Sequence, residues 1–157
     1  MYYTEYESPI GTLLLTSDGT SLTGLWMGKV PSGAAAPQLA VFREAAQWLD
    51  AYFAGEPGTV SFPLSPSGTA FQQLIWKLLS AIPFGQTRSY GELAKEAAAI
   101  MGKKSMSSQA VGGAVGRNPI SIIIPCHRVI GANGALTGYA GGLSRKEWLL
   151  RHEEEHK

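Results

Sequence analysis

Apolar and polar positions along the first third of the chain predict a small sheet followed by one helix. Residues 2–7, 12–16 and 22–27 have the aromatic and aliphatic composition of short strands. Asp18-Gly19, between the second and third runs, is a hairpin signal. From Val41 to Phe53, apolar side chains recur every three to four residues and form one wide face, as in an amphipathic helix. This third contains no catalytic grouping, so we expect it to be structural.

Beyond residue 61 the pattern is mainly helical. Residues 62–68 are rich in Pro, Ser and Gly, and we interpret them as a linker between an N-terminal lobe, residues 1–61, and a C-terminal domain, residues 69–157. Several helix starts are signalled by capping residues. They are the capping boxes Thr69–Gln72, Ser89–Glu92 and Ser144–Glu147, and the single cap Ser107.

Two of these helices form a helix-turn-helix candidate. They are predicted over residues 89–101 and 107–115, with a short basic turn between them. Gln109 lies near the start of the second helix, which also contains glycines that each cost about 1 kcal/mol relative to alanine. These glycines are Gly112, Gly113 and Gly116. Their presence fits the close approach of a DNA backbone or of another segment of the chain.

The run Ile120–Ile124 leads to the only cysteine of the chain. Its length and β-branched composition predict a short buried strand. Pro125 ends the run, and Cys126 and His127 follow. A neighbouring imidazole can lower the pKa of a thiol from about 8.5 and so produce the nucleophilic thiolate. A free cysteine is also often a small buried hydrophobic residue, so adjacency alone leaves both interpretations open.

Composition narrows the class of protein. Of 157 residues, 45% are hydrophobic and 16% charged, which is typical of a globular chain and not of a disordered one. No apolar run reaches membrane-spanning length and no basic and apolar leader opens the chain, so we expect a cytoplasmic protein without membrane contact. A single cysteine excludes an internal disulfide framework and a multi-cysteine zinc site.

The net charge of +1 is unevenly distributed. Residues 1–85 carry three basic and six acidic side chains, whereas residues 86–128 carry six basic and two acidic ones. Residues 129–157 are balanced. The basic excess therefore lies next to the Cys-His pair, where it suits a polyanion, although six basic residues also describe an ordinary solvated surface.

The C-terminal segment His152–His156 formally matches the zinc-protease pattern H-E-x-x-H. A charged terminal helix produces such a match easily, and a third ligand would have to come from upstream. We therefore favour a charged terminal helix over a zinc protease site.

The motif Pro125–Val129 resembles the active-site motif of the O6-alkylguanine-DNA alkyltransferases, also called methylated-DNA–protein-cysteine methyltransferases. The resemblance extends from about Gly68 to the C-terminus, and residues 1–60 resemble the variable N-terminal lobe of that family only in pattern. Further matching segments are Ser89-Tyr90, Ala110–Ala114, Asn118-Pro119, Gly138–Leu143 and Lys146–Leu150. The implied fold is α+β, with a small sheet-plus-helix lobe and a mostly helical C-terminal lobe in which a short buried strand leads to the cysteine.

The resemblance implies a reaction and a role for each matching residue. O6-alkylguanine is flipped out of double-stranded DNA by a monomeric protein, and the alkyl group moves irreversibly to the protein, once per molecule. The resemblance leaves open whether O4-alkylthymine is a second substrate. The implied catalytic residues are the acceptor Cys126, the base His127 acting through a water, the orienting carboxylate Glu153, the turn-holding Asn118, and Tyr90, which rotates the nucleotide and supplies a proton. The implied DNA-binding and base-binding residues are Gln109, Ala110, Gly112, Gly113, Arg117, Arg128, Val129, Tyr139 and, through its backbone N–H, Ala140.

This chain departs from the family at Gln109, where members usually carry an arginine that fills the gap left by the flipped base. The N-terminal lobe also lacks the Cys and His zinc ligands of some relatives, so we predict no metal. The reaction that the resemblance implies needs no cofactor. Three alternatives remain. A binding-only alkyltransferase-like protein would replace the cysteine, a helix-turn-helix regulator gives no reason for the Cys-His pair, and a Cys-His hydrolase is compatible with the pair alone.

Overall fold

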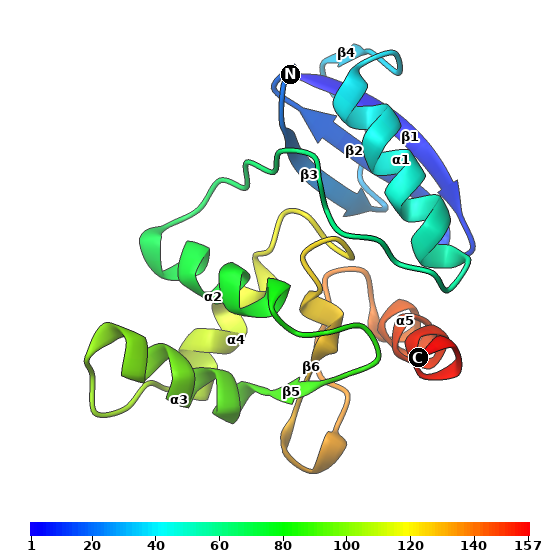
Figure 1. The fold of residues 1–157 in the computed structure, drawn as a ribbon. Helices are drawn as coiled ribbons and strands as arrows, with labels where there is room; N and C mark the ends of the chain where they lie inside the picture. Colours follow the sequence, from blue (N-terminus) through cyan, green and yellow to red (C-terminus); the bar gives the residue numbers. More distant parts are fainter.

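The computed structural model describes residues 1–157 and opens with a four-stranded sheet. The strand order is β3-β2-β1-β4; the first three strands are antiparallel and β4 runs parallel to β1 (Figure 1). The strand bounds are β1 (Tyr2–Ser8), β2 (Gly11–Ser17), β3 (Leu22–Met27) and β4 (Ala34–Ala35). The three strands predicted from the sequence are thereby confirmed, and β4 was not foreseen.

Helix α1 (Ala40–Phe53) lies along one face of this sheet (Figure 1). Its buried residues are Val41, Phe42, Ala45, Leu49 and Tyr52, which recur at helical spacing as predicted. They pack in one core with the fully buried leucines of the sheet, Leu13, Leu15, Leu22 and Leu25.

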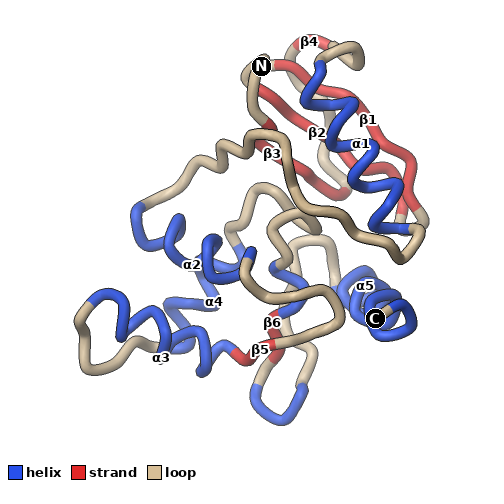
Figure 2. The backbone as a smooth tube through the Cα atoms, in the orientation of Figure 1, coloured by secondary structure: helices blue, strands red, loops and turns tan.

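The connection from α1 to α2 (Ala70–Ser80) runs as a long loop along the edge strand β3 (Figure 2). The Leu22 N–H donates to the carbonyl of Pro63 at 2.9 Å, and the Ser65 N–H donates to the Leu22 carbonyl at 2.8 Å. Further along β3, the Leu25 N–H donates to the Pro119 carbonyl at 2.8 Å. Both the linker and the segment before the cysteine therefore bond to the sheet, so the free edge of β3 joins the two lobes.

Most of the remaining chain is helical. The elements are α3 (Tyr90–Met101), α4 (Ser108–Gly116) and α5 (Leu143–His156), the 3-10 turns η1 (Cys126–Arg128) and η2 (Ala132–Gly134), and two short parallel strands, β5 (Arg88–Ser89) and β6 (Val129–Ile130). Helices α3 and α4 form the predicted helix-turn-helix pair. None of the helices is long and apolar enough to cross a bilayer.

Three of the four predicted helix caps are confirmed. The side chains of Thr69 and Ser89 each complete a full capping box, and Ser107 accepts a hydrogen bond from the Ala110 N–H at 3.0 Å. The box predicted at Ser144 is wrong, because α5 begins one residue earlier and no side chain caps it. Its start follows Gly142, whose φ of 93° turns the chain sharply into the helix.

The strand predicted over Ile120–Ile124 is also wrong. The run is buried as expected, but only Ile120 makes a β-bridge, to Leu25, and the rest is a tight turn in which Ile122 has a φ of 71°. A left-handed conformation is rare for a β-branched residue. Apolar composition predicted the burial correctly, but it could not show that the run folds into a turn and does not pair as a strand.

Candidate active site

Cys126 begins the 3-10 turn η1 and is only 4% exposed. The buried Asn118 amide holds the turn that precedes it. Its Nδ2 donates to the Ile124 carbonyl at 2.8 Å, and its Oδ1 accepts from the Ile120 N–H at 3.0 Å. One side chain thus ties both ends of the turn, and this fixes where the thiol emerges.

The surroundings of the Cys126 thiol shift its pKa in both directions. Burial raises the pKa of Cys126, while the side chains of Asn118 and Ser121 and the positive charge of Lys146 act in the opposite direction. The net effect is a raised pKa, so the resting group is the thiol. A nucleophilic reaction at Cys126 therefore requires a base to take its proton.

His127, the next residue along the chain, forms a buried pair with Glu153. His127 is fully buried, and its Nε2 lies 2.5 Å from Glu153 Oε2, whereas its Nδ1 has no partner. Burial lowers the pKa of His127, although Glu153 partly offsets this. Burial alone would raise the pKa of Glu153, but hydrogen bonds and charges from His127 and Arg128 bring it down to about 2. An ionised carboxylate accepts only, so Nε2 carries the proton and Nδ1 offers its lone pair.

Glu153 is also held by neighbours outside the Cys-His motif. Arg128 Nε donates to Oε1 at 2.8 Å and Arg128 Nη2 donates to Oε2 at 3.1 Å. The Gly85 N–H donates to Oε1 at 3.0 Å, and the Tyr52 hydroxyl donates to Oε2 at 2.7 Å. The carboxylate is therefore fixed by donors from helix α1, from the loop after α2 and from η1.

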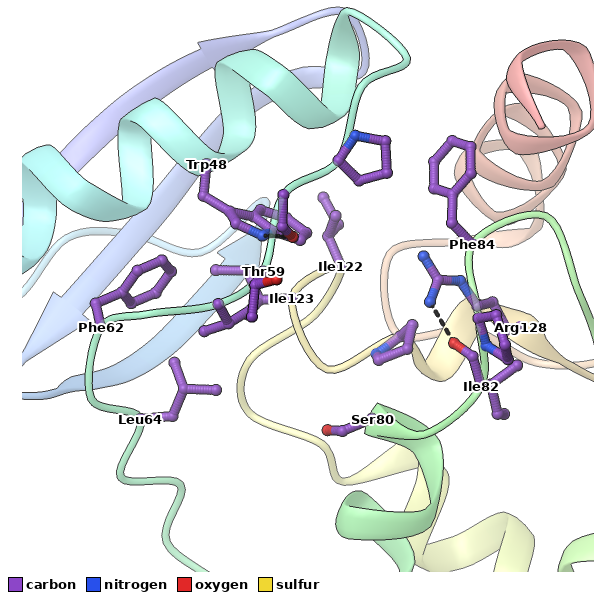
Figure 3. A pocket seen from close by; sticks show the side chains of 15 residues that line it. Trp48, Thr59, Phe62, Leu64, Ser80, Ile82, Phe84, Ile122, Ile123 and Arg128 are labelled. Atoms are coloured by element: carbon purple, nitrogen blue, oxygen red, sulfur yellow. Dashed lines mark hydrogen bonds between the residues drawn. The ribbon is translucent and has the colours of Figure 1, made fainter.

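Two predicted DNA-binding and base-binding residues lie inside the protein. Arg128 is buried, and its Nη1 donates to the Ile82 carbonyl at 2.6 Å (Figure 3), so all three guanidinium nitrogens are engaged within the chain. Val129 has no exposed surface in β6. In this structure neither Arg128 nor the Val129 side chain is exposed to a DNA backbone or a base.

A groove of about 740 Å³ opens where α3 and α4 face the loop before α5. Its lining includes six of the predicted residues, namely Tyr90, Gln109, Gly112, Gly113, Tyr139 and Ala140. A Cβ on Gly112 would lie 3.7 Å from the Tyr90 ring, so the small residue keeps this part of the groove open. Ala110 is exposed on α4, and Arg117 lines a different hollow beside Trp26 and Lys29 of the sheet lobe.

The groove contains polar groups that point to a ligand. The Tyr139 hydroxyl is buried without a partner, and the Ala140 N–H donates to no group of the chain. Thr137 Oγ1 donates to the Tyr90 hydroxyl at 3.0 Å, which leaves the Tyr90 proton free to donate elsewhere. Burial, followed by the neighbouring Cys126, raises the pKa of Tyr139 well above its usual value.

A second cavity, of about 590 Å³, lies on another side of the cysteine turn (Figure 3). Trp48 of α1, Phe62 of the linker, Phe84, Ile122 and Arg128 are among its lining residues, and it shares none with the groove. Within it, Arg128 Nη1 is already bonded to the Ile82 carbonyl.

Two important residues were not foreseen. Lys146 is fully buried, and its Nζ donates to the carbonyls of Val129 at 2.6 Å and Thr137 at 3.1 Å, which joins α5 to the groove loop. Tyr52 contacts Glu153 from a lobe expected to be only structural. Sequence offers no signal for either, because a lysine normally marks a solvated face and a tyrosine at helical spacing normally marks a core.

The side chains of the H-E-x-x-H segment make contacts within the protein. His152 Nε2 lies 2.7 Å from the Tyr52 carbonyl, and its ring stacks on Trp148. Glu153 serves His127 and Arg128. No group of three or more His, Cys, Asp or Glu side chains is arranged to hold a metal.

Fold and site together define an α+β protein in which a buried Cys-His-Glu array adjoins an open groove at a helix-turn-helix. Two family models match the chain: the ribonuclease-like domain of 6-O-methylguanine DNA methyltransferase over residues 1–66, and its DNA-binding domain over residues 70–155. The methylated-DNA–protein-cysteine methyltransferase of Methanosarcina acetivorans is 49% identical over 98% of both chains. That of Haemophilus influenzae is 46% identical over 98% of this chain and 87% of its own length.

Solved structures agree. The OGT protein of Mycobacterium tuberculosis in complex with DNA has a TM-score of 0.88 and 46% identity, with 99% of this chain and 94% of that chain covered. A protein from Pyrococcus kodakaraensis shares the fold at a TM-score of 0.68 and 23% identity, with 97% and 98% covered. The chain belongs to the 6-O-methylguanine DNA methyltransferase family, whose members repair DNA by alkyl transfer.

The Glu153 network predicts a specific pH dependence of stability. The pKa of Glu153 is about 2 in the folded protein and about 4.3 in an unfolded chain, so folding favours the ionised form. Its contribution is complete above about pH 5 and is lost as the pH falls through 4 towards 2. Over that interval, urea titrations should show the free energy of unfolding of the native protein falling more than that of Glu153→Gln, by on the order of 3 kcal/mol.

The matched control is Glu154→Gln, which neutralises the next carboxylate along α5. Glu154 is exposed and pairs with Lys157 at 2.7 Å, so its variant should follow the native protein at every pH. Parallel curves for the native protein and Glu153→Gln would contradict the network.

Proposed function

We propose that this chain repairs O6-alkylguanine in double-stranded DNA by moving the alkyl group irreversibly to Cys126, with one reaction per molecule and no cofactor. The observation that carries the proposal is a buried thiol that precedes the buried His127–Glu153 pair in the chain and has Tyr139, which lines the open groove, as a neighbour. The M. tuberculosis relative solved with DNA supports DNA as the partner. The lone free cysteine supports a reducing, cytoplasmic location.

The chemistry needs only groups of the chain. Nδ1 of His127 takes the thiol proton through a bridging water, and the thiolate attacks the alkyl carbon attached to O6. The C–O bond breaks as the S–C bond forms, and guanine leaves as an anion. The Tyr90 hydroxyl supplies a proton and the Ala140 N–H stabilises the oxygen as charge develops. The thioether product is stable, which ends activity after one reaction.

Entry of the base requires extrusion from the duplex. Cys126 is 4% exposed, so a stacked base cannot reach it, and flipping costs a few kcal/mol. The exposed Gln109 in the first turn of α4 lies at the groove, in the position to occupy the vacated space. In this proposal residues 69–157 bind DNA and accept the alkyl group, and residues 1–61, joined by the linker 62–68, support them.

The direct test is the intact mass of the protein after incubation with duplex DNA that contains O6-methylguanine. Repair adds one methyl group to the native chain, with a yield that stops at one per molecule. Cys126→Ser should show no adduct and yet bind the lesion, because the groove and α4 remain. No adduct on native protein that binds the lesion would leave a binding-only protein, and equal loss of binding in Cys126→Ser would make the cysteine structural.

The position of Gln109 yields a second prediction. Gln109→Arg adds a positive charge beside the phosphates, so DNA binding should tighten mainly at low salt, and the slope of log K against log salt should steepen by about 0.9. Transfer from saturating DNA should change much less, because this residue acts on extrusion.

Gln109→Ala should slow repair of duplex DNA more than reaction with the free base analogue O6-benzylguanine, which needs no flipping.

The control is Gln86→Ala, an exposed glutamine outside the groove, which should leave both rates unchanged. Single-turnover rates on both substrates are compared within each variant. An equal fall of both rates in Gln109→Ala would mean that Gln109 supports the fold or pocket.

A further inference from the structure

We propose that Tyr52, in helix α1 of the sheet lobe, is a positioning residue for alkyl transfer: its hydroxyl holds Glu153 so that His127 presents Nδ1 to the thiol. The inference rests on the proposed function of Cys126 and assigns part of the reactive array to a lobe that carries no nucleophile. Tyr52 is fully buried, and its hydroxyl donates to Glu153 Oε2 at 2.7 Å.

The same carboxylate oxygen serves Tyr52 and His127. Oε2 lies 2.5 Å from His127 Nε2, and the Tyr52 hydroxyl lies 3.5 Å from that nitrogen. The two donors therefore sit side by side on one oxygen. Rotation of the carboxylate would break both bonds, so the Tyr52 bond fixes the orientation in which Nε2 keeps its proton and Nδ1 stays free.

Tyr52 is itself held rigidly. Its ring stacks on Trp48 with 5.5 Å between centroids and meets Phe84 edge-on at 5.7 Å. Its backbone carbonyl accepts a hydrogen bond from His152 Nε2 at 2.7 Å. Backbone and side chain of one residue thus bond to consecutive residues of α5, His152 and Glu153, so movement of α1 would be transmitted to the carboxylate.

The Tyr52 hydroxyl also affects the pKa of His127, because its hydrogen bond reduces the negative charge on Glu153 Oε2. Burial and Glu153 raise the pKa of Tyr52, so the phenol remains a donor throughout the working pH range. The other groups facing His127 are Glu153, which favours the imidazolium, and Arg128 and Lys146, which oppose it. Cys126 is adjacent in sequence and carries the thiol itself. Removal of the Tyr52 donor leaves more negative charge on Oε2, which favours the imidazolium and raises the pKa of His127.

The experiment measures single-turnover reaction with O6-benzylguanine between pH 5 and pH 9, so that DNA binding plays no part. Tyr52→Phe keeps the ring and removes only the hydroxyl. The plateau rate should fall about ten-fold, less than for loss of a residue that directly orients a catalytic imidazole. The acid limb of the pH–rate profile should move to higher pH, because a raised pKa means that His127 becomes neutral only at higher pH.

Tyr6→Phe is the matched control. Tyr6 also belongs to the sheet lobe, and its hydroxyl donates to Asp50 of α1 at 2.6 Å, so this variant removes a comparable bond to the same helix without touching the array. Its profile should superimpose on that of the native protein. A loss of rate in Tyr52→Phe without a shifted acid limb would overturn the proposal, since loosened packing alone has that effect.

Replacement of Tyr52 by 3-fluorotyrosine keeps the proposal testable if Tyr52→Phe fails to fold. The more acidic phenol donates more strongly, so the acid limb should move to lower pH, and an unshifted limb would overturn the proposal. Native protein that takes up no methyl group from duplex DNA containing O6-methylguanine would instead refute the proposed function. If the native protein reacts and the acid limbs of the Tyr52 variants match its own, only the role of Tyr52 is refuted.

Discussion

The Glu153 carboxylate is the group on which the rest of the structure depends. It accepts hydrogen bonds from Tyr52, Gly85, His127 and both Nε and Nη2 of Arg128. A buried charge costs several kcal/mol unless it is paired and fully hydrogen-bonded. The fold must therefore bring helix α1, the loop after α2 and the turn η1 to one point on α5. The sheet lobe and the helical lobe meet where the carboxylate needs its donors.

The same constraint explains how a buried thiol becomes usable. Burial keeps both Cys126 and His127 neutral at rest, which protects the thiol from oxidation, since the thiolate is the susceptible form. The groove supplies the other half of the site, with free donors at Tyr90 and Ala140 and small residues along α4 that leave space for a large flat ligand. The proposed reaction needs no cofactor, because base, nucleophile and proton donor all belong to the chain.

Local chemistry decided how much could be predicted from the sequence. The caps Thr69, Ser89 and Ser107 act within their own helix starts, so their prediction held. The resemblance to the family predicted that Glu153 pairs with His127, although the two residues are distant in the sequence. Ile122, Lys146 and Tyr52 depend on which distant segments surround them, and their residue types also suit ordinary core or surface positions. Their roles became clear only from the structure. Ile122 lies in a buried turn, Lys146 bonds to two backbone carbonyls, and Tyr52 bonds to the Glu153 carboxylate.

We propose that Glu153 fixes His127 as a neutral base with Nδ1 free. Nitrogen-15 NMR of selectively labelled histidine at pH 7 tests this directly, with His127→Gln used to assign the resonances. His127 should have a protonated Nε2 and an unprotonated Nδ1. A proton on Nδ1, or an imidazolium with both nitrogens protonated, would contradict it, because neither form could take the proton of Cys126.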